Sequence, residues 1–168
     1  MQVFVVGSPL ETAMALDPKR LRSQIREAHI ILAAIHGEGK GWLHHPVVLM
    51  YSEPNSVRWL QMYADILEGY LAGYTGLERA DREAKAITPE FHTPEFIKQM
   101  KRRLYTKNPK EYERWAELGT SEDNYYWSPT RRAWLMYRNG KHLETILLKR
   151  FMLLQIRCGT RTLLYSHI

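Results

Sequence analysis

The sequence has very little cysteine. Cys158 is the single cysteine among 168 residues. One cysteine cannot form an internal disulfide, and its neighbours do not have the spacing of a metal site or of a thiol paired with a base. We therefore expect a protein of a reducing compartment, without a disulfide framework.

Long apolar runs are also missing. A membrane-spanning helix needs about 18 or more consecutive apolar residues, and none is present. The apolar stretch at residues 3–6 is too short for such a helix and lacks the charged flank of a secretory signal. The sequence has no internal repeat and no low-complexity tract. These absences predict a soluble, cytoplasmic protein that does not bind membranes.

What the sequence does have is an excess of positive charge near its end. The formal net charge is +6. Residues 1–130 hold 16 Lys/Arg and 17 Asp/Glu, whereas residues 131–168 hold 8 Lys/Arg and one acid, Glu144. This balance is compatible with a polyanionic partner but does not establish one. We expect one domain over residues 1–130 and a basic helical extension over 131–168 that packs on it.

The chain is rich in aromatic residues, with 5 Trp and 10 Tyr. Aromatic rings interleaved with Arg and Lys suit stacking on nucleic-acid bases. Core packing is the alternative interpretation for most of them.

Prolines and capping residues indicate several helices. Asp17-Pro18 is typical of a helix start, because proline at the first helical position gives up an N–H that has no partner there. The helix is expected to reach residue 35, with an apolar stripe formed by Leu21, Ile25, Ala28, Leu32 and Ile35. Further helices are predicted at residues 56–73, 77–87, 94–105, 109–118 and about 141–157. Strand propensity is confined to residues 2–6 and 162–165, and residues 42–51 look irregular. The predicted fold is mainly α: a compact single-domain helical bundle with an extended amino-terminal segment.

The predicted first helix carries a cationic face around one carboxylate. Lys19, Arg22 and Arg26 share one stripe of this helix, and Arg20, Ser23, Gln24 and Glu27 occupy the next one. A solvated face with a weak ion pair explains this pattern, and so does a surface that binds phosphates around an acidic group.

The order of these features resembles the pyrimidine-dimer DNA glycosylase family, also known as the phage endonuclease V type. The matching stretches are residues 17–27, which end in Arg26-Glu27, then the turn at residues 41–46 with Trp42 and His45-Pro46, and the helix around Trp59. A weaker similarity runs from Leu104 through residues 107–109 to residues 126–129. The resemblance covers about residues 1–130 and is strongest in the first 65, while residues 131–168 match nothing that we can assign.

The resemblance implies a DNA repair enzyme that needs neither cofactor nor metal. In the family, the α-amine of the first residue attacks deoxyribose C1′ at the damaged site, expels the base and forms an imine, and β-elimination then nicks the strand. The family's catalytic glutamate follows an arginine on the first helix, which corresponds to Glu27 here. The nucleophile would be the amine of Met1, and Glu27 would stabilise the cationic sugar and move protons.

The chemistry of a terminal amine supports this role. An α-amine has a pKa of about 7.7–8.0, so roughly a tenth or more of it is neutral at pH 7, whereas an ordinary lysine is almost fully charged. Gln2 departs from the phage pattern, where a small second residue allows removal of the initiator methionine. We therefore expect Met1 to be retained.

The partner implied is double-stranded DNA that contains damaged pyrimidines or abasic sites. The predicted DNA contacts are Lys19, Arg20, Arg22, Arg26, His44, His45, Lys101, Arg102 and Trp127. For the two histidines, a structural role in the turn is an equal alternative. Lys101 and Arg102 belong to a basic run from Lys98 to Lys110 that can also be a solvated helix face. Trp127 and its neighbours Tyr125 and Tyr126 can contact an opened base or fill the core.

Two other functions remain open at this stage. A metal-dependent nuclease is suggested weakly by Asp81 and the Glu83-x-Lys85 spacing, although no strand precedes them. A non-catalytic DNA-binding helical protein would use the same basic face, with Glu27 only as an ion-pair partner.

Overall fold

The computed structural model describes residues 2–38, 41–121, 124–130, 133–138 and 141–143. The chain divides into two compact units, residues 1–122 and residues 123–168. Each unit is described by itself.

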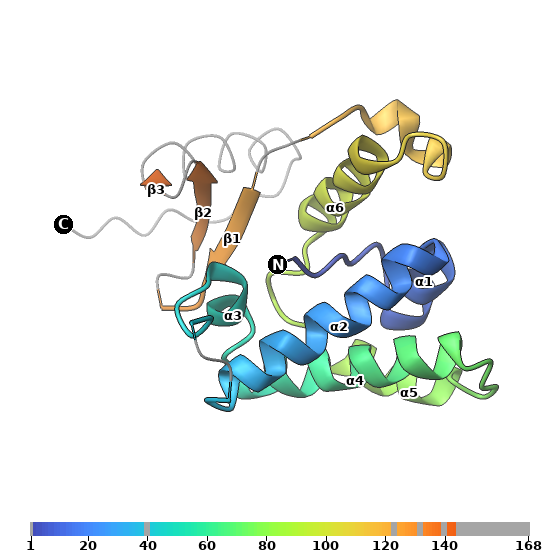
Figure 1. Cartoon of the computed structure of the whole chain (residues 1–168), viewed down its shortest axis with the longest axis horizontal. Helices are drawn as coiled ribbons and strands as arrows, with labels where there is room; N and C mark the ends of the chain where they lie inside the picture. Colours follow the sequence, from blue (N-terminus) through green and yellow to red (C-terminus); the bar gives the residue numbers. More distant parts are fainter. Residues whose placement is uncertain (1, 39–40, 122–123, 131–132, 139–140, 144–168) are drawn as a thin grey trace, which may run out of the picture. The chain divides into compact units, whose positions relative to one another are not determined.

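The first unit is built from helices, which confirms the predicted fold class. Its elements in chain order are α1 (Pro9–Ala15), α2 (Pro18–Ile35), α3 (Pro46–Met50), α4 (Pro54–Leu71), α5 (Glu78–Ala86), α6 (Pro94–Lys107) and the 3₁₀ helix η1 (Glu113–Leu118). Helix α4 packs against α1, α2 and α5 (Figure 1). It buries one face made of large side chains, among them Trp59, Leu60, Tyr63, Ile66 and Leu67.

Helix α2 begins where the sequence predicts. The Asp17 carboxylate caps it by accepting hydrogen bonds from the backbone N–H groups of Lys19 and Arg20, both at 3.0 Å. Pro18 occupies the first helical position, where its missing N–H costs nothing. The buried face of α2 includes Leu21, Gln24, Ala28 and Ile31, so its charged residues lie on the opposite side. The cap thus fixes the start of the helix that carries Glu27.

Residues 2–6 are extended, as predicted, but they form no strand in the described structure. The side chains of residues 3–6 are all buried. Backbone hydrogen bonds that a neighbouring strand would supply come instead from side chains. Gln24 and Tyr63 bind the backbone of residues 2–4, and Thr12 Oγ1 accepts the N–H of Val6 at 3.1 Å. Figure 1 shows this segment running between α2 and α6.

Two short helices were not predicted. Helix α1 starts at a capping box, in which Ser8 accepts the N–H of Glu11 and the Glu11 carboxylate accepts the N–H of Ser8. Helix α3 lies within residues 42–51, which were expected to be irregular. His45 caps it through Nδ1, and Pro46 takes its first position. The helix predicted at residues 109–118 is shortened to η1, because Asn108 and the following residues form a turn instead.

The second unit contains a three-stranded antiparallel sheet in the order β1-β2-β3. The strands are β1 (Asn124–Ser128), β2 (Ala133–Arg138) and β3 (Lys141–Leu143), and Trp127 pairs in register with Trp134. The prediction of a helix from about residue 141 is therefore wrong for residues 141–143, which form β3. The rest of that predicted helix lies outside the described residues. The strand expected at residues 162–165 also lies outside them. Packing of residues 131–168 on the first domain stays a prediction.

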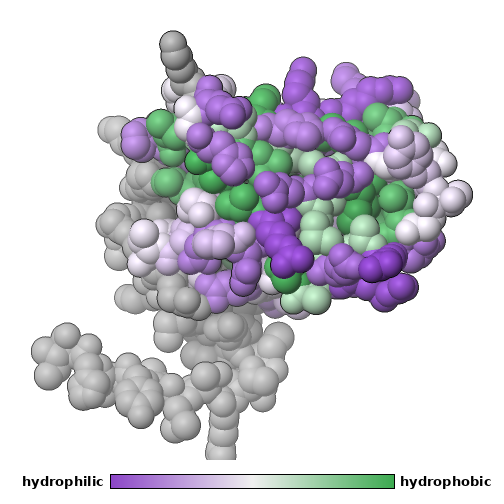
Figure 2. All heavy atoms as spheres, turned by 90° about the horizontal axis from the view of Figure 1, so that it is seen from below, coloured by the Kyte–Doolittle hydropathy of each residue, from purple (hydrophilic) through white to green (hydrophobic). Residues whose placement is uncertain are grey.

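None of the helices within the described ranges is long and apolar enough to cross a membrane. On the face seen in Figure 2, hydrophilic side chains are spread between smaller apolar areas.

Candidate active site on helix α2

Glu27 lies half-buried on α2, in the midst of the predicted basic face. Lys19, Arg22 and Arg26 are exposed, and Arg20 is half-buried. Arg22 makes one long hydrogen bond, from Nη1 to the carbonyl of Pro18 at 3.4 Å, so its guanidinium keeps most of its donors for other partners. The helix therefore presents cationic side chains to solvent around a carboxylate that is partly shielded from water.

The extended segment is anchored beside this part of α2. The carbonyl of Gln2 accepts a hydrogen bond from Gln24 Nε2 at 3.0 Å, and the Gln2 side chain contacts Met100 Sδ on α6 at 3.4 Å. Gln24 precedes Glu27 by three residues, which places the two side chains on neighbouring turns of one helix. Met1, the predicted nucleophile, lies outside the described residues.

His45 is electrostatically coupled to Glu27. Partial burial lowers the pKa of His45 and the positive charge of the chain's amino terminus lowers it further, whereas the Glu27 carboxylate acts in the opposite direction. His45 Nδ1 accepts the N–H of Val47 at 3.2 Å, so the neutral ring carries its proton on Nε2. His45 thus combines the structural role weighed from the sequence, as the cap of α3, with a place near Glu27. Its neighbour His44 is exposed.

Trp42 and Leu43 lie beside His45 in the turn before α3. The rings of Trp42 and His45 are 5.6 Å apart and tilted by 60°. Trp42 is 44% exposed and Leu43 is 47% exposed, which is high for such large apolar side chains.

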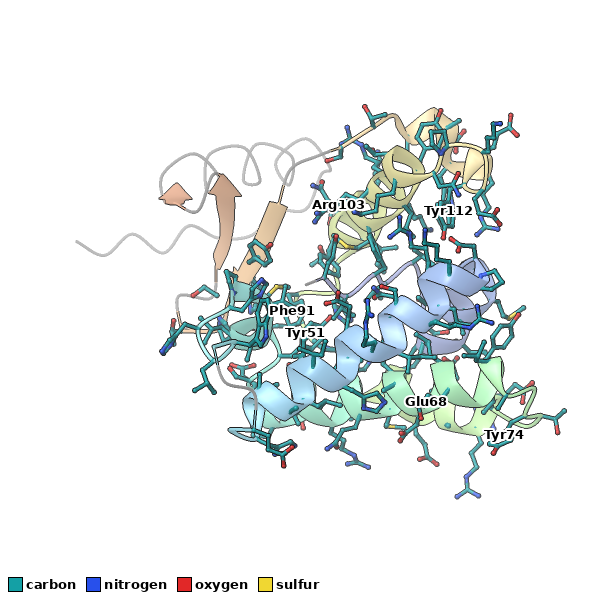
Figure 3. The ribbon with its side chains drawn as sticks, viewed as in Figure 1. Tyr51, Glu68, Tyr74, Phe91, Arg103 and Tyr112 are labelled. Carbon is teal, nitrogen blue, oxygen red and sulfur yellow. The ribbon has the colours of Figure 1, made fainter. Side chains whose placement is uncertain are left out.

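Arg20 belongs to a second group of cations, formed with α6. Burial lowers the pKa of Lys107, and the positive charges of Arg20 and Arg103 lower it further. Figure 3 shows Arg103 on α6. Cations that repel each other in this way favour an anionic partner. The sequence predicted a basic run that includes Arg103 and Lys107, but not their closeness to Arg20.

Asp17 and Tyr112 join the start of α2 to the turn before η1. The Tyr112 hydroxyl donates to Asp17 Oδ2 at 2.5 Å, and Figure 3 shows Tyr112 beside this end of α2. Burial raises the pKa of Asp17, but the hydrogen bonds from Tyr112 and from the two capping N–H groups outweigh it and leave the pKa lowered. Asp17 is therefore a charged structural cap.

The remaining predicted DNA contacts lie elsewhere. Arg102 Nη2 donates to the carbonyl of Thr120 at 2.6 Å, so part of this guanidinium serves the fold. Lys101 is half-buried on α6, and Trp127 is half-buried on β1 in the second unit.

The residues that suggested a nuclease have partners within α1 and α5. The buried Asp81 carboxylate accepts the N–H of Leu10 at 2.8 Å and pairs with Lys85 at 3.1 Å. Glu83 pairs with Arg79 at 3.3 Å and is more than half exposed. Asp81 therefore holds α1 against α5. Within the described ranges, no three His, Cys, Asp or Glu side chains form a group that could hold a metal ion.

Comparison with known proteins supports the resemblance seen in the sequence. Residues 1–68 match a family model described as pyrimidine dimer DNA glycosylase. This segment contains α1, α2, α3 and most of α4, and hence Arg26, Glu27 and His45. Searches of curated proteins and of solved structures gave no significant match. The amino-terminal segment is thus similar to that of pyrimidine dimer DNA glycosylases, and the match ends within α4.

Proposed function

We propose that this chain, whose first 68 residues match the pyrimidine dimer DNA glycosylase family, is a DNA glycosylase with AP lyase activity. Its substrate is double-stranded DNA that contains pyrimidine dimers or abasic sites. The proposal is supported most directly by one observation: Glu27 lies half-buried on the basic face of α2, and Gln24, three residues earlier, binds the backbone of Gln2.

The nucleophile in this proposal is the α-amine of Met1. Covalent geometry keeps that nitrogen within ~7 Å of the Gln2 carbonyl, because consecutive Cα atoms are about 3.8 Å apart. On α2, Glu27 follows Gln24 by about 4.5 Å along the helix axis. The proposal requires that a deoxyribose bound over this region contact both groups.

The reaction proceeds in two stages. The neutral amine attacks C1′, the glycosidic bond breaks, and the departing base takes its electron pair and a proton. The amine loses a proton, O4′ leaves C1′ and is protonated, and an imine joins the enzyme to the opened sugar. Loss of a C2′ proton then expels the 3′ phosphate by β-elimination, and water hydrolyses the imine.

Glu27 accepts and returns protons in these steps, and its charge stabilises the cationic sugar. Neutral His45 offers an Nε2–H donor beside it. A positive charge on the amino terminus disfavours a second positive charge on His45, which helps to keep the imidazole neutral.

The basic side chains of α2 bind the DNA backbone. Arg22 and Arg26 are exposed and contact phosphates, with Lys19 at the start of the helix and Arg20 on the side of α6. His44, Lys101, Arg102 and Trp127 are further proposed contacts. An enzyme that acts on a glycosidic bond must open the base stack, so aromatic side chains are suited to contact the exposed bases.

The test is base excision and strand nicking by Glu27→Gln. We expect its single-turnover rate on an oligonucleotide with a cyclobutane dimer to fall by about 10²- to 10⁴-fold, because general acid–base catalysis is lost. Glu68→Gln is the matched control, since Glu68 is an exposed carboxylate on α4 that pairs with His29. Both variants are assayed in EDTA, because the proposed chemistry uses no metal.

Wild-type protein that neither cuts the glycosidic bond at the dimer nor nicks an abasic site contradicts the proposal. If Glu27→Gln reacts as fast as Glu68→Gln, Glu27 takes no part in catalysis.

A further inference from the structure

Gln24 is a buried polar side chain that takes the place of a neighbouring strand. It is 3% exposed. Its Oε1 accepts the N–H of Phe4 at 2.7 Å, and its Nε2 donates to the carbonyl of Gln2 at 3.0 Å. One amide group therefore satisfies two backbone groups of the extended segment, as a strand would in a sheet.

Tyr63 on α4 completes this arrangement from the other side. Its hydroxyl donates to the carbonyl of Phe4 at 2.8 Å and lies 3.3 Å from Gln24 Oε1. Burial raises the pKa of Tyr63, so the hydroxyl stays protonated and remains a donor. Tyr63 thus holds both the segment and the amide that binds it.

The hydrogen bonds of Gln24 and Tyr63 restrain the extended segment more tightly than burial of its apolar side chains would. The apolar side chains of residues 3–6 are buried and hold the segment in the core. Burial does not fix the position of the backbone along α2, because apolar contacts are not directional. The hydrogen bonds of Gln24 do fix it, since they bind one specific carbonyl and one specific N–H.

We propose that Gln24, oriented by Tyr63, is a positioning residue for the reaction: it fixes residues 2–4 along α2 and so holds the terminal amine at the distance from Glu27 that attack on C1′ requires. This inference rests on the proposed function. A displacement of about 1 Å in a reacting group can lower a rate by ~10²-fold, so loss of this anchor should affect chemistry more than DNA binding.

The test compares Gln24→Met with Gln99→Met. Methionine keeps the length of the side chain but removes both hydrogen bonds. Gln99 is a half-buried glutamine on α6 whose Nε2 donates to Ser121 Oγ. Two quantities are measured on folded protein: the single-turnover rate of borohydride-trapped adduct on an abasic-site oligonucleotide, and the Kd for the same DNA. We expect Gln24→Met to lower the trapping rate by about 10- to 100-fold with Kd changed less than twofold. Gln99→Met should change neither by more than about twofold.

A second variant covers the case in which Gln24→Met does not fold. Tyr63→Phe keeps the buried ring and removes only the hydroxyl, and we expect a smaller loss of trapping rate, about 3- to 10-fold, at unchanged Kd.

The outcomes distinguish a failure of the positioning role of Gln24 from a failure of the proposed function. A trapping rate within twofold of wild type in folded Gln24→Met, or in Tyr63→Phe when the first variant is unfolded, overturns the positioning role. A parallel loss of rate and DNA affinity also overturns it, since Gln24 then supports the DNA-binding face. Absence of any adduct with wild-type protein instead overturns the proposed function, and the positioning role with it.

Discussion

His92 is a histidine enclosed by aromatic rings in the core of the first unit. Its ring centroid lies 4.4 Å from that of Trp59 and 5.3 Å from that of Phe96, and its Nε2 is 3.0 Å from the Tyr51 hydroxyl. Tyr51 also packs edge-on against Phe91. Figure 3 labels these two residues close to each other. Burial lowers the pKa of His92 to about 3, so the folded protein keeps this ring neutral.

This burial makes the stability of the protein depend on pH. Between the usual histidine pKa of about 6.5 and about 3, the unfolded chain binds a proton at His92 that the folded chain does not bind. The free energy of unfolding should therefore fall as the pH falls, by about 2 kcal/mol from pH 7 to pH 5 through this group. Urea denaturation at both pH values should show His92→Phe losing this part of the pH dependence.

Exposed His44 supplies the control, because His44→Gln should keep the wild-type pH dependence. Equal pH dependence of wild type and a folded His92→Phe would show that His92 is protonated equally in both states.

Single residues differ in how far the sequence predicts them. Glu27 could be proposed from its position after Arg26 and from its helix face. The role of Gln24 could not, because the partners of a side-chain amide are set by which backbone packs on it. From the sequence Gln24 was assigned to the cationic face beside Glu27, whereas in the structure it lies on the buried side of α2.

At the scale of elements, α2 combines a buried apolar face with an exposed cationic one. We expect Arg22→Gln and Arg26→Gln each to weaken DNA binding equally for all DNA sequences, because each variant loses one phosphate contact. For the same reason, the slope of the logarithm of the binding constant against the logarithm of the salt concentration should decrease in magnitude by about one. Arg79→Gln on α5 is the control, since this exposed arginine pairs with Glu83.

The measurement is DNA affinity by fluorescence anisotropy at several salt concentrations, with undamaged and dimer-containing duplexes. If Arg22→Gln and Arg26→Gln keep the slope of Arg79→Gln, this face of α2 does not bind the DNA backbone.

Helices were predictable where a proline start is followed by a stretch long enough to show an apolar stripe. Helices α2, α4 and α6 begin at prolines, and α2 and α6 also have capping side chains. Helices α1 and α3, with 7 and 5 residues, are too short for a periodic pattern. Residues 2–6 have the composition of a strand, but their partners are side chains of distant helices. The sheet of the second unit was missed because its aromatic residues fit a loop or a core equally well.

At the scale of the whole molecule, the positive charge is unevenly distributed. The excess lies after residue 130, while the residues assigned to catalysis lie in the first unit. Overall charge is compatible with a polyanionic partner, but it neither establishes one nor locates a site. The family match over residues 1–68 and the arrangement around α2 are the support for proposing this chemistry in the amino-terminal unit.

The central claim is that the terminal amine of this unit forms an imine with damaged DNA. The most direct test is borohydride trapping on an abasic-site oligonucleotide, followed by mass spectrometry of the cross-linked peptide and of the native amino terminus. We predict a single adduct on the α-nitrogen of Met1, which acetylation of the terminus abolishes. An adduct on a lysine, or an undiminished adduct after acetylation, would contradict the claim.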